Sequence, residues 1–322
     1  MSRPSALVTG CAGFLGSHLA EALLARGRTV VGVDCFTDYY ARARKEANVA
    51  GLRRAPHFRL VEADLATDRL EGLLDGVEVV FHLAAQPGVR PSFGAEFRDY
   101  LRHNVVATER LLEAAAAHSL KAFVYASSSS VYGQQLTYPV REDAPLRALS
   151  PYGSSKVITE ELASMFWRAR HVPVVGMRYF TVYGPRQRPD MAFSRFLERA
   201  LSGRALQVLG DGRQVREFTY VQDAVAATLA AAESGEHGSA YNVGGGAAVS
   251  VLEVIELLEG LLGRSLPVEH LRAGPGDPRR TEADVARAAR DLAYRPVTPL
   301  RDGLRAQLEE ALDRAGAVEA MA

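Results

Sequence analysis

The stretch Ala6-Leu-Val-Thr-Gly-Cys-Ala-Gly-Phe-Leu-Gly16 predicts the fold of the N-terminal half. Its first four residues read as a short apolar strand, and hydrophobic side chains recur at helical spacing after it. Gly10, Gly13 and Gly16 lie between the two, where glycines let the backbone approach a pyrophosphate and the helix start offers N–H groups. A tight turn without a ligand is the alternative, but the bracketing strand and helix favour a dinucleotide site.

Strand-like and helix-like segments continue to alternate along the chain. The strands are expected at 29–34, 58–63, 77–83, 122–126 and 173–178, with long helices at 95–118 and 152–170. This order predicts an α/β fold with a doubly wound parallel (Rossmann) sheet, whose ligands lie at the carboxyl ends of the strands. His82 falls inside an apolar strand, so a hydrogen-bonded core histidine is favoured over a ligand.

An acidic residue ends the second strand. A carboxylate at Asp34 can accept hydrogen bonds from both ribose hydroxyls of an adenosine and would repel a 2′-phosphate. The cofactor is therefore expected to be NAD rather than NADP. Asp64 and Leu65 follow the third strand and are expected to contact the adenine.

Composition excludes several classes of function. The formal net charge of the 322 residues is zero, so neither a nucleic acid nor an anionic membrane is expected as a partner. Two cysteines, Cys11 and Cys35, rule out a disulfide framework and suit a reducing compartment. No apolar run approaches the roughly 20 residues of a membrane span, no signal peptide is expected and no metal site is expected. These features predict a cytoplasmic location.

The segment Tyr152-Gly-Ser-Ser-Lys156 is the candidate catalytic element. Residues four apart on a helix share a face, and an ammonium near a phenol lowers the phenol pKa toward neutrality. Lys156 is one of only three lysines in a chain with 38 lysines and arginines. With 12 tyrosines in the chain, a Tyr-x-x-x-Lys pattern can easily arise by chance. The neighbouring motifs therefore decide whether this one is catalytic.

Together the motifs resemble those of the extended short-chain dehydrogenase/reductases, the sugar-nucleotide epimerases and dehydratases. To the glycine turn, Asp34 and Tyr-x-x-x-Lys they add His82-Leu-Ala-Ala85, a serine run before Val131-Tyr-Gly133, and Arg178-Tyr-Phe180. The resemblance implies a tightly held, recycled NAD. It places the cofactor against Gly10, Gly13, Phe14, Leu15, Gly16, Asp34, Asp64, Leu65, Leu83, Ala84, Ala85, Tyr152, Lys156 and Tyr179.

Within that family the chain looks most like the UDP-glucuronate 4-epimerases. The likeness rests on three stretches: Asp34-Cys-Phe-Thr-Asp-Tyr-Tyr40, Ala85-Gln-Pro-Gly-Val-Arg90 and Phe180-Thr-Val-Tyr-Gly-Pro-Arg-Gln-Arg-Pro-Asp-Met191. The third contains Arg186 and Arg188, a cationic pair that a sugar carboxylate needs and a neutral hexose does not. In so arginine-rich a chain, a surface or interface role is the alternative.

One departure from the family pattern distinguishes the possible reactions. Ser129 and Ser130 stand where the dehydratases and the glucuronate decarboxylases carry an acid. Those reactions need an extra general acid or base, whereas epimerisation does not. The expected activity is therefore 4-epimerisation of UDP-glucuronate, an isomerase reaction. Epimerisation of UDP-glucose, decarboxylation of UDP-glucuronate and a non-catalytic NAD sensor remain alternatives, in that order.

The resemblance implies a role for each catalytic residue. Tyr152 takes the proton of the sugar 4-hydroxyl, Ser128 hydrogen-bonds the same hydroxyl, and Lys156 holds the nicotinamide ribose and lowers the Tyr152 pKa. Because oxidation at C4 makes a β-keto acid, the carboxylate must be held out of the alignment that releases CO2. The substrate is expected to contact Arg90, Ser128, Ser129, Ser130, Tyr152, Thr181, Arg186, Arg188, Gln207, Arg216 and Asp277.

The second half predicts a smaller, mixed α/β substrate domain. Residues 1–178 are expected to bind NAD, with 217–238 packing back onto them, and 179–216 with 239–322 to bind the UDP-sugar. Gly210-Asp-Gly212 predicts a hairpin between strands 206–209 and 214–221. Ser250 is expected to cap a helix, and a final helix follows Thr298-Pro299.

The two long helices carry more apolar side chains than one sheet face needs. A four-helix homodimer seam explains the surplus and is common in the family, whereas a broad core face is the alternative. The side chains are Phe97, Leu101, Val105, Leu111, Leu112, Ile158, Leu162, Met165, Phe166 and Trp167.

Overall fold

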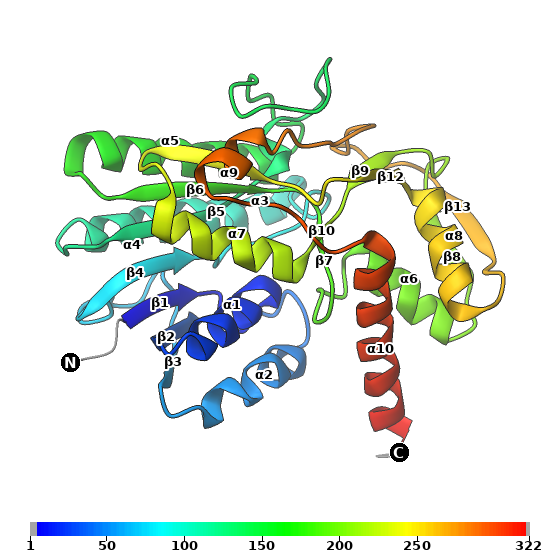
Figure 1. Ribbon diagram of the computed structural model, residues 1–322, viewed down its shortest axis with the longest axis horizontal. Coiled ribbons are helices and arrows are strands. Elements are labelled where there is room, and N and C mark those ends of the chain that lie inside the picture. Colours follow the sequence, from blue (N-terminus) through cyan, green and yellow to red (C-terminus); the bar gives the residue numbers. More distant parts are fainter. Residues whose placement is uncertain (1–4, 320–322) are drawn as a thin grey trace.

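The computed structural model describes residues 5–319, and a seven-stranded parallel sheet forms its larger part (Figure 1). The strand order is β11-β6-β5-β4-β1-β2-β3. Because the order turns back between β1 and β4, a crevice forms there at the carboxyl ends of the strands. The predicted doubly wound sheet is confirmed. Its strands are β1 (Ser5–Thr9), β2 (Thr29–Asp34), β3 (Phe58–Glu62), β4 (Val77–His82), β5 (Ala122–Ser128), β6 (Val174–Tyr179) and β11 (Ser239–Val243).

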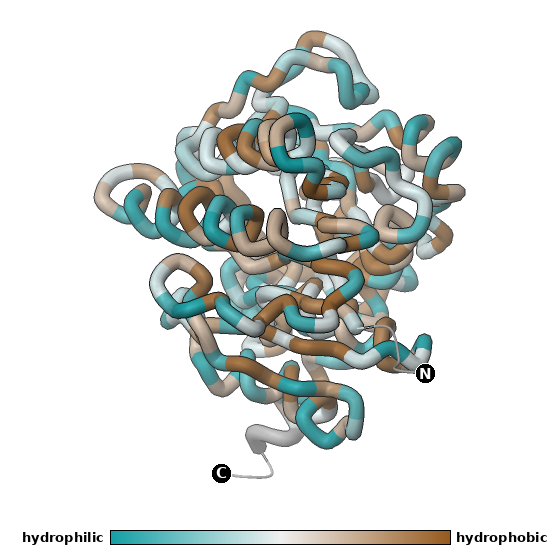
Figure 2. Tube along the Cα trace, turned by 90° about the vertical axis from the view of Figure 1, so that its left-hand side faces the viewer, coloured by the Kyte–Doolittle hydropathy of each residue, from teal (hydrophilic) through white to brown (hydrophobic). Residues whose placement is uncertain are grey.

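Helices cover both faces of this sheet. One face packs against α1 (Phe14–Ala25), α2 (Arg42–Ala50), α7 (Val221–Ser234) and α9 (Ala286–Asp291). The other face packs against α4 (Ala107–Ala115) and α5 (Pro151–Arg170). Hydrophobic residues follow the inner strands, while the outer helices alternate between hydrophobic and hydrophilic residues (Figure 2). Burial on both faces explains the continuous apolar strands of the sequence.

The helix predicted at 95–118 is a continuous helical segment that combines 3₁₀, α and π geometry. A 3₁₀ turn (Gly94–Glu96) and α3 (Phe97–Tyr100) lead into a π-helical stretch (Leu101–Val106) before α4. In that stretch, the buried Asn104 side chain accepts from the Gln86 N–H at 2.7 Å and donates to Ser155 Oγ at 2.9 Å. The π geometry therefore coincides with polar contacts to α5 and to a loop of the functional site.

A second unit holds three two-stranded sheets and its own core. They pair β7 (Val182–Tyr183) with β10 (Thr219–Tyr220), β9 (Val215–Glu217) with β12 (Ala248–Ser250), and β8 (Leu206–Leu209) with β13 (Val268–Leu271). Its helices are α6 (Ala192–Leu201), α8 (Val251–Leu262) and α10 (Leu300–Glu319). Ser250 caps α8 together with Glu253, as expected.

Two predictions about this half are wrong. The strands around Gly210-Asp-Gly212 form no hairpin, because β8 pairs in parallel with β13 and β9 pairs with β12. Strand β11 belongs to the large sheet beside β6, although 239 onward was assigned to the substrate domain. Helix α7 does pack on the large sheet. The other domain limits stay a prediction, and residues 1–4 and 320–322 of the predicted units lie outside the described residues.

Among residues 5–319, no helix combines the length and the apolarity needed to cross a membrane. His82 is buried, and its ring nitrogens lie 2.8 Å from Thr9 Oγ1 and 2.9 Å from Thr108 Oγ1. Burial lowers the pKa of His82 to about 3, so it stays neutral. The prediction of a hydrogen-bonded core histidine is confirmed.

Candidate active site

A cavity of about 1070 Å³ opens at the carboxyl ends of the strands and reaches into the second unit. Gly10 and Asp34 line it at the ends of β1 and β2, and Ser128 and Tyr179 line it at the ends of β5 and β6. Gln207 and residues near it line its far end. The lining of the cavity therefore includes both residues predicted to bind the cofactor and residues predicted to bind the substrate.

The glycine turn is a cradle that a side chain would fill. Gly10 has a φ of +69°, and a Cβ on it would lie 2.8 Å from the Ala84 nitrogen. A Cβ on Gly16 would lie 2.1 Å from the Gly10 oxygen. Phe14 and Leu15 begin α1 and also line the cavity. Backbone N–H groups at a helix start can thus be reached by a phosphate.

Asp34 is fixed beside this turn. Its carboxylate accepts from the Phe36 N–H at 2.8 Å and from the Ala12 N–H at 3.1 Å. Burial raises the pKa of Asp34, whereas these N–H groups and the Lys45 ammonium oppose the rise. An oriented carboxylate at this position fits a ribose diol, so the residues present fit NAD.

The remaining predicted cofactor residues also line the cavity: Asp64, Leu65, Leu83, Ala84, Ala85, Tyr152, Lys156 and Tyr179. Asp64 pairs with Arg102 and accepts from the Ala66 N–H at 2.8 Å. The Tyr179 hydroxyl lies 2.7 Å from Thr228 Oγ1. Both polar groups are thus held in place by the protein itself.

Tyr152 and Lys156 lie on the first turns of α5, which Ser150 caps by accepting from the Gly153 N–H at 3.0 Å. The Lys156 ammonium donates to the Ala126 oxygen of β5 at 2.8 Å. Ser128, at the end of β5, accepts from the Ser130 N–H at 3.1 Å, and its hydroxyl opposes the rise in the Tyr152 pKa. The structure therefore brings the three predicted catalytic residues to one wall of the cavity.

The expected fall of the Tyr152 pKa is wrong for this structure. Burial raises the pKa of Tyr152, and the Ser128 hydroxyl and the charge of Arg188 only reduce the rise. Burial also lowers the pKa of Lys156 to about 8, while Glu160 works against that change. At both groups burial is the largest cause of the pKa shift, because a charge removed from water loses its hydration, and neither group contributes to the shift of the other.

Most of the predicted substrate residues line the same cavity: Arg90, Ser128, Ser129, Ser130, Tyr152, Thr181, Arg188, Gln207, Arg216 and Asp277. Arg90 and Asp277, which both line the cavity, form an ion pair at 2.5 Å. Burial lowers the pKa of Arg216, whose Nη1 donates to the Val215 oxygen at 2.9 Å. Gln207 accepts from Arg195 at 3.3 Å.

Arg186 is the exception. In the described chain it lies outside the lining of the cavity, and its Nη2 donates to Glu21 of α1 at 2.8 Å. Its backbone has a φ of +65°, and its N–H donates to Glu310 of α10. The predicted substrate role is corrected, because Arg186 instead ties the second unit to the glycine-turn helix.

Sequence reasoning missed several lining residues, among them Lys45, Tyr39 and Asp190. Lys45 is buried, donates to the Thr37 oxygen at 2.8 Å and faces Asp34. Its being one of only three lysines was the available signal. Tyr39 and Asp190 meet across the cavity, and both lie within stretches that carried the family resemblance.

A family model described as "NAD dependent epimerase/dehydratase family" matches residues 6–244. The chain belongs to this family. It is 44% identical to YtcB of Bacillus subtilis, named an uncharacterized UDP-glucose epimerase, over 92% of this chain and 95% of that one. It is 34% identical to a UDP-glucuronate 4-epimerase of Thermodesulfobacterium geofontis, over 93% of each chain.

The fold comparison agrees with the family. A crystal structure of UDP-glucuronic acid 4-epimerase from Bacillus cereus, in complex with UDP-glucuronic acid and NAD, superposes with a TM-score of 0.94. The two sequences are 41% identical, and the match covers 96% of this chain and 99% of that one. A likeness of this extent confirms the predicted Rossmann architecture with its smaller second unit.

Proposed function

We propose that this protein is an NAD-dependent isomerase that interconverts UDP-glucuronate and UDP-galacturonate by inverting C4. The observation that carries the proposal is the arrangement of Tyr152, Ser128 and Arg188, which line one cavity with serines at 129 and 130. In the proposal Tyr152 is the base, Ser128 binds the sugar hydroxyl and Arg188 binds the sugar carboxylate. The comparisons support the proposal through relatives named for this reaction.

The residues divide the work as follows. The Tyr152 oxygen takes the proton of the 4-hydroxyl and later returns it, and Ser128 holds the same oxygen of the sugar. The Lys156 ammonium holds the ribose next to the reacting carbon. When bound, NAD accepts the hydride from C4, returns it to the opposite face and adds a positive charge that favours the phenolate. Arg216 and its neighbours at the far end hold the diphosphate while the sugar turns.

The test is an end-point assay of the NAD-loaded protein with UDP-glucuronate, with separation of the products. UDP-galacturonate as the main product supports the proposal, and UDP-xylose or no product contradicts it. A neutral UDP-hexose epimerase is the second candidate, which the 44% identity to YtcB favours. Faster conversion of UDP-glucose than of UDP-glucuronate would decide for that candidate.

The Arg188→Ala variant is expected to weaken binding of UDP-glucuronate about 10- to 100-fold and to release some UDP-pentose. A hydrogen bond to a charged group contributes roughly 1.5–3 kcal/mol, which corresponds to that loss. Calorimetric titration and product analysis measure the two effects. Arg186→Ala is the matched control, because Arg186 pairs with Glu21 outside the cavity. Unchanged affinity and products in Arg188→Ala would exclude the carboxylate-binding role.

The protein is also proposed to form a homodimer through the α3–α4 segment and α5. Leu111, Leu112 and Phe166, counted among the surplus side chains, are buried in the core. Exposed apolar side chains remain at Ile158 and Met165, seven residues apart on one face of α5, and at Val106 in the π-helical stretch, which contacts α5. Such a stripe is suited to an antiparallel contact between two copies.

An Ile158→Glu variant is expected to shift the protein from dimer to monomer, because a buried carboxylate in the seam would stay unpaired. Sedimentation velocity at micromolar concentration measures the change. Leu312→Glu, on an exposed site of α10 away from this layer, is the control. A monomeric wild-type protein at the same concentration would refute the seam.

A further inference from the structure

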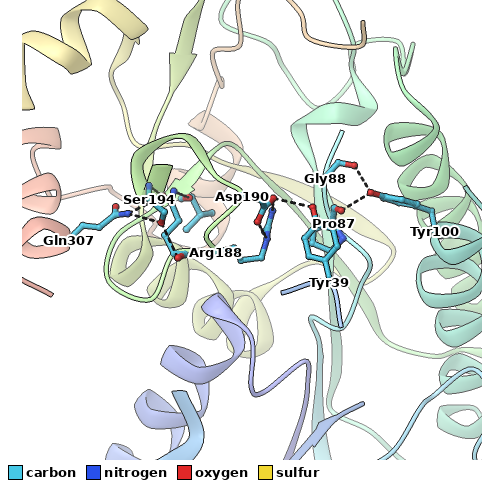
Figure 3. A network of polar contacts seen from close by, with 10 residues as sticks. Tyr39, Pro87, Gly88, Tyr100, Arg188, Asp190, Ser194 and Gln307 are labelled. Carbon is cyan, nitrogen blue, oxygen red and sulfur yellow. Dashed lines mark hydrogen bonds and ion pairs between the residues drawn. The ribbon is translucent and has the colours of Figure 1, made fainter. Parts of the chain in front are cut away.

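The three stretches that carry the resemblance to glucuronate epimerases converge at one point of the cavity (Figure 3). Tyr39 comes from the loop after β2, Gly88 from the loop after β4, and Asp190 from the loop between β7 and α6. The Tyr39 hydroxyl donates to Asp190 Oδ2 at 3.1 Å. The proposed reaction gives none of these three residues a role.

Asp190 holds the guanidinium of Arg188 in a fixed plane. Arg188 Nε donates to Oδ1 and Nη2 donates to Oδ2, each at 3.0 Å. A two-point contact of this kind fixes the orientation as well as the position of the guanidinium. It also uses only one edge of the guanidinium, so Nη1 remains available for an acceptor in the cavity.

Gly88 and Tyr100 fix the other end of the contact. A Cβ on Gly88 would lie 2.5 Å from the Tyr39 hydroxyl oxygen. Only a glycine at position 88 therefore lets the loop approach Tyr39 this closely. The Tyr100 hydroxyl lies 2.8 Å from the Pro87 oxygen and 2.9 Å from the Gly88 oxygen and holds this loop. The Tyr39 hydroxyl is thereby directed at Asp190 (Figure 3).

We propose that Tyr39, Asp190 and Arg188 form a bridge across the sugar end of the cavity, in which Asp190 presets Arg188 and Tyr39 holds Asp190 in place. Asp190 and Tyr39 are positioning residues, and the bridge controls how rigidly the carboxylate of the substrate is held. The inference rests on the proposed epimerase function and adds residues that set its product fidelity.

The chemical reason lies in the 4-keto sugar acid that the proposed reaction forms. After C4 is oxidised by the nicotinamide cofactor, the C5–C6 bond can break. CO2 then leaves, the electron pair stays on C5 as an enolate, and C5 takes a proton from water. Return of the hydride from the reduced nicotinamide cofactor to the C4 ketone then gives the UDP-pentose. This loss requires the C5–C6 bond to stand perpendicular to the carbonyl plane. A guanidinium held in one plane fixes the carboxylate away from that angle, whereas a mobile one does not.

The bridge predicts that loss of Asp190 affects substrate affinity and product fidelity differently. The Asp190 carboxylate partly neutralises Arg188, so its removal makes the site more positive while it releases the guanidinium. Affinity for the acidic sugar is therefore expected to stay equal or to increase in Asp190→Asn, although product fidelity falls. A residue that only maintained the local fold would lose both together.

The test uses NAD-loaded wild-type protein, Asp190→Asn and Tyr39→Phe. Calorimetry with UDP-glucuronate and with UDP measures binding, and product separation measures the ratio of UDP-pentose to UDP-galacturonate. Asp190→Asn is expected to raise that ratio about tenfold, because hydrogen bonds between charged groups are lost. Tyr39→Phe, which loses one hydrogen bond to a carboxylate, is expected to raise it about threefold. UDP affinity is expected to stay within about twofold in both.

Asp143→Asn is the matched control, since Arg141 and Asp143 have the same spacing in sequence and pair at 3.3 Å on the surface. Wild-type product ratios in both Asp190→Asn and Tyr39→Phe would overturn the bridge while leaving the epimerase function intact. If Asp190→Asn fails to fold, Tyr39→Phe alone decides by the same ratio. A wild-type protein that makes no UDP-galacturonate would overturn the proposed function, and the bridge with it.

Discussion

The Tyr152→Phe variant is expected to lose roughly a thousandfold or more in kcat while it still binds NAD. The variant removes one oxygen and nothing else: the ring stays at the start of α5, edge-on to Tyr100 with 6.1 Å between the ring centres. Without that oxygen, no group at the same place can take the proton of the sugar 4-hydroxyl. Ser128 remains, but an alcohol is far too weak a base at neutral pH.

Steady-state assays and fluorescence of bound cofactor separate the two effects. Tyr241→Phe is the matched control, because Tyr241 is a buried tyrosine outside the cavity lining whose hydroxyl accepts from the Glu236 N–H at 3.0 Å. A kcat in Tyr152→Phe above about a tenth of the wild-type value would show that another group takes the proton. Loss of NAD binding would instead mean that the Tyr152 hydroxyl holds the cofactor.

The protonation state of Tyr152 depends on its burial in the folded protein. Burial raises the Tyr152 pKa, so the phenolate is scarce at neutral pH unless positive charge is added nearby. Sequence reasoning treated the Tyr152 and Lys156 pair in isolation and therefore missed the desolvation, which depends on the walls of the cavity. The chemistry of the pair was predictable from four-residue spacing, whereas its pKa depended on the tertiary fold.

The same division applies to the rest of the molecule. The large sheet was predictable because its strands, glycine turn and helices are local patterns. The pairing of β8 with β13 was missed because it joins segments about 60 residues apart and Gly210-Asp-Gly212 offered a nearer partner. The irregular geometry of 94–115 coincides with the contacts of Asn104 to Gln86 and Ser155, which no periodicity reveals.

Side-chain direction was the least predictable property. Arg186 and Arg188 are two residues apart in one motif, yet Arg186 pairs with Glu21 and Arg188 pairs with Asp190. The left-handed backbone at Arg186 helps to separate them. The contact of Asp190 with Tyr39 spans 151 positions, so a sequence alone could not supply it.

Replacing Glu160 by Gln is expected to lower the free energy of unfolding by about 3–5 kcal/mol, since removing one partner of a buried ion pair leaves the other unpaired. Glu160 lies one turn after Lys156 and accepts from Arg178 Nε at 2.9 Å and Nη2 at 2.7 Å. Both side chains are less than a tenth exposed, and Ser127 donates to the same carboxylate. Arg178 Nη1 also donates to Tyr132 at 2.8 Å, and Tyr132 donates to Asn242 of β11 at 2.7 Å. The pair therefore joins α5 to three neighbouring strands.

Chemical denaturation measures this loss, with Glu113→Gln as control because Glu113 and Arg170 form an exposed pair at 3.2 Å. Equal, small changes in both variants would contradict the buried-pair argument.

A second consequence of Glu160→Gln concerns Lys156. Burial lowers the pKa of Lys156 from 10.5 to about 8, and Glu160 opposes that change. In Glu160→Gln the lysine should lose its proton at lower pH, so activity should decline earlier as pH rises. Stability should respond in the opposite sense: protonated Lys156 costs folding energy below pH about 8, and that cost disappears as pH rises toward 10.5. Activity therefore falls and stability rises with increasing pH, because the reaction needs the Lys156 ammonium whereas the fold disfavours it.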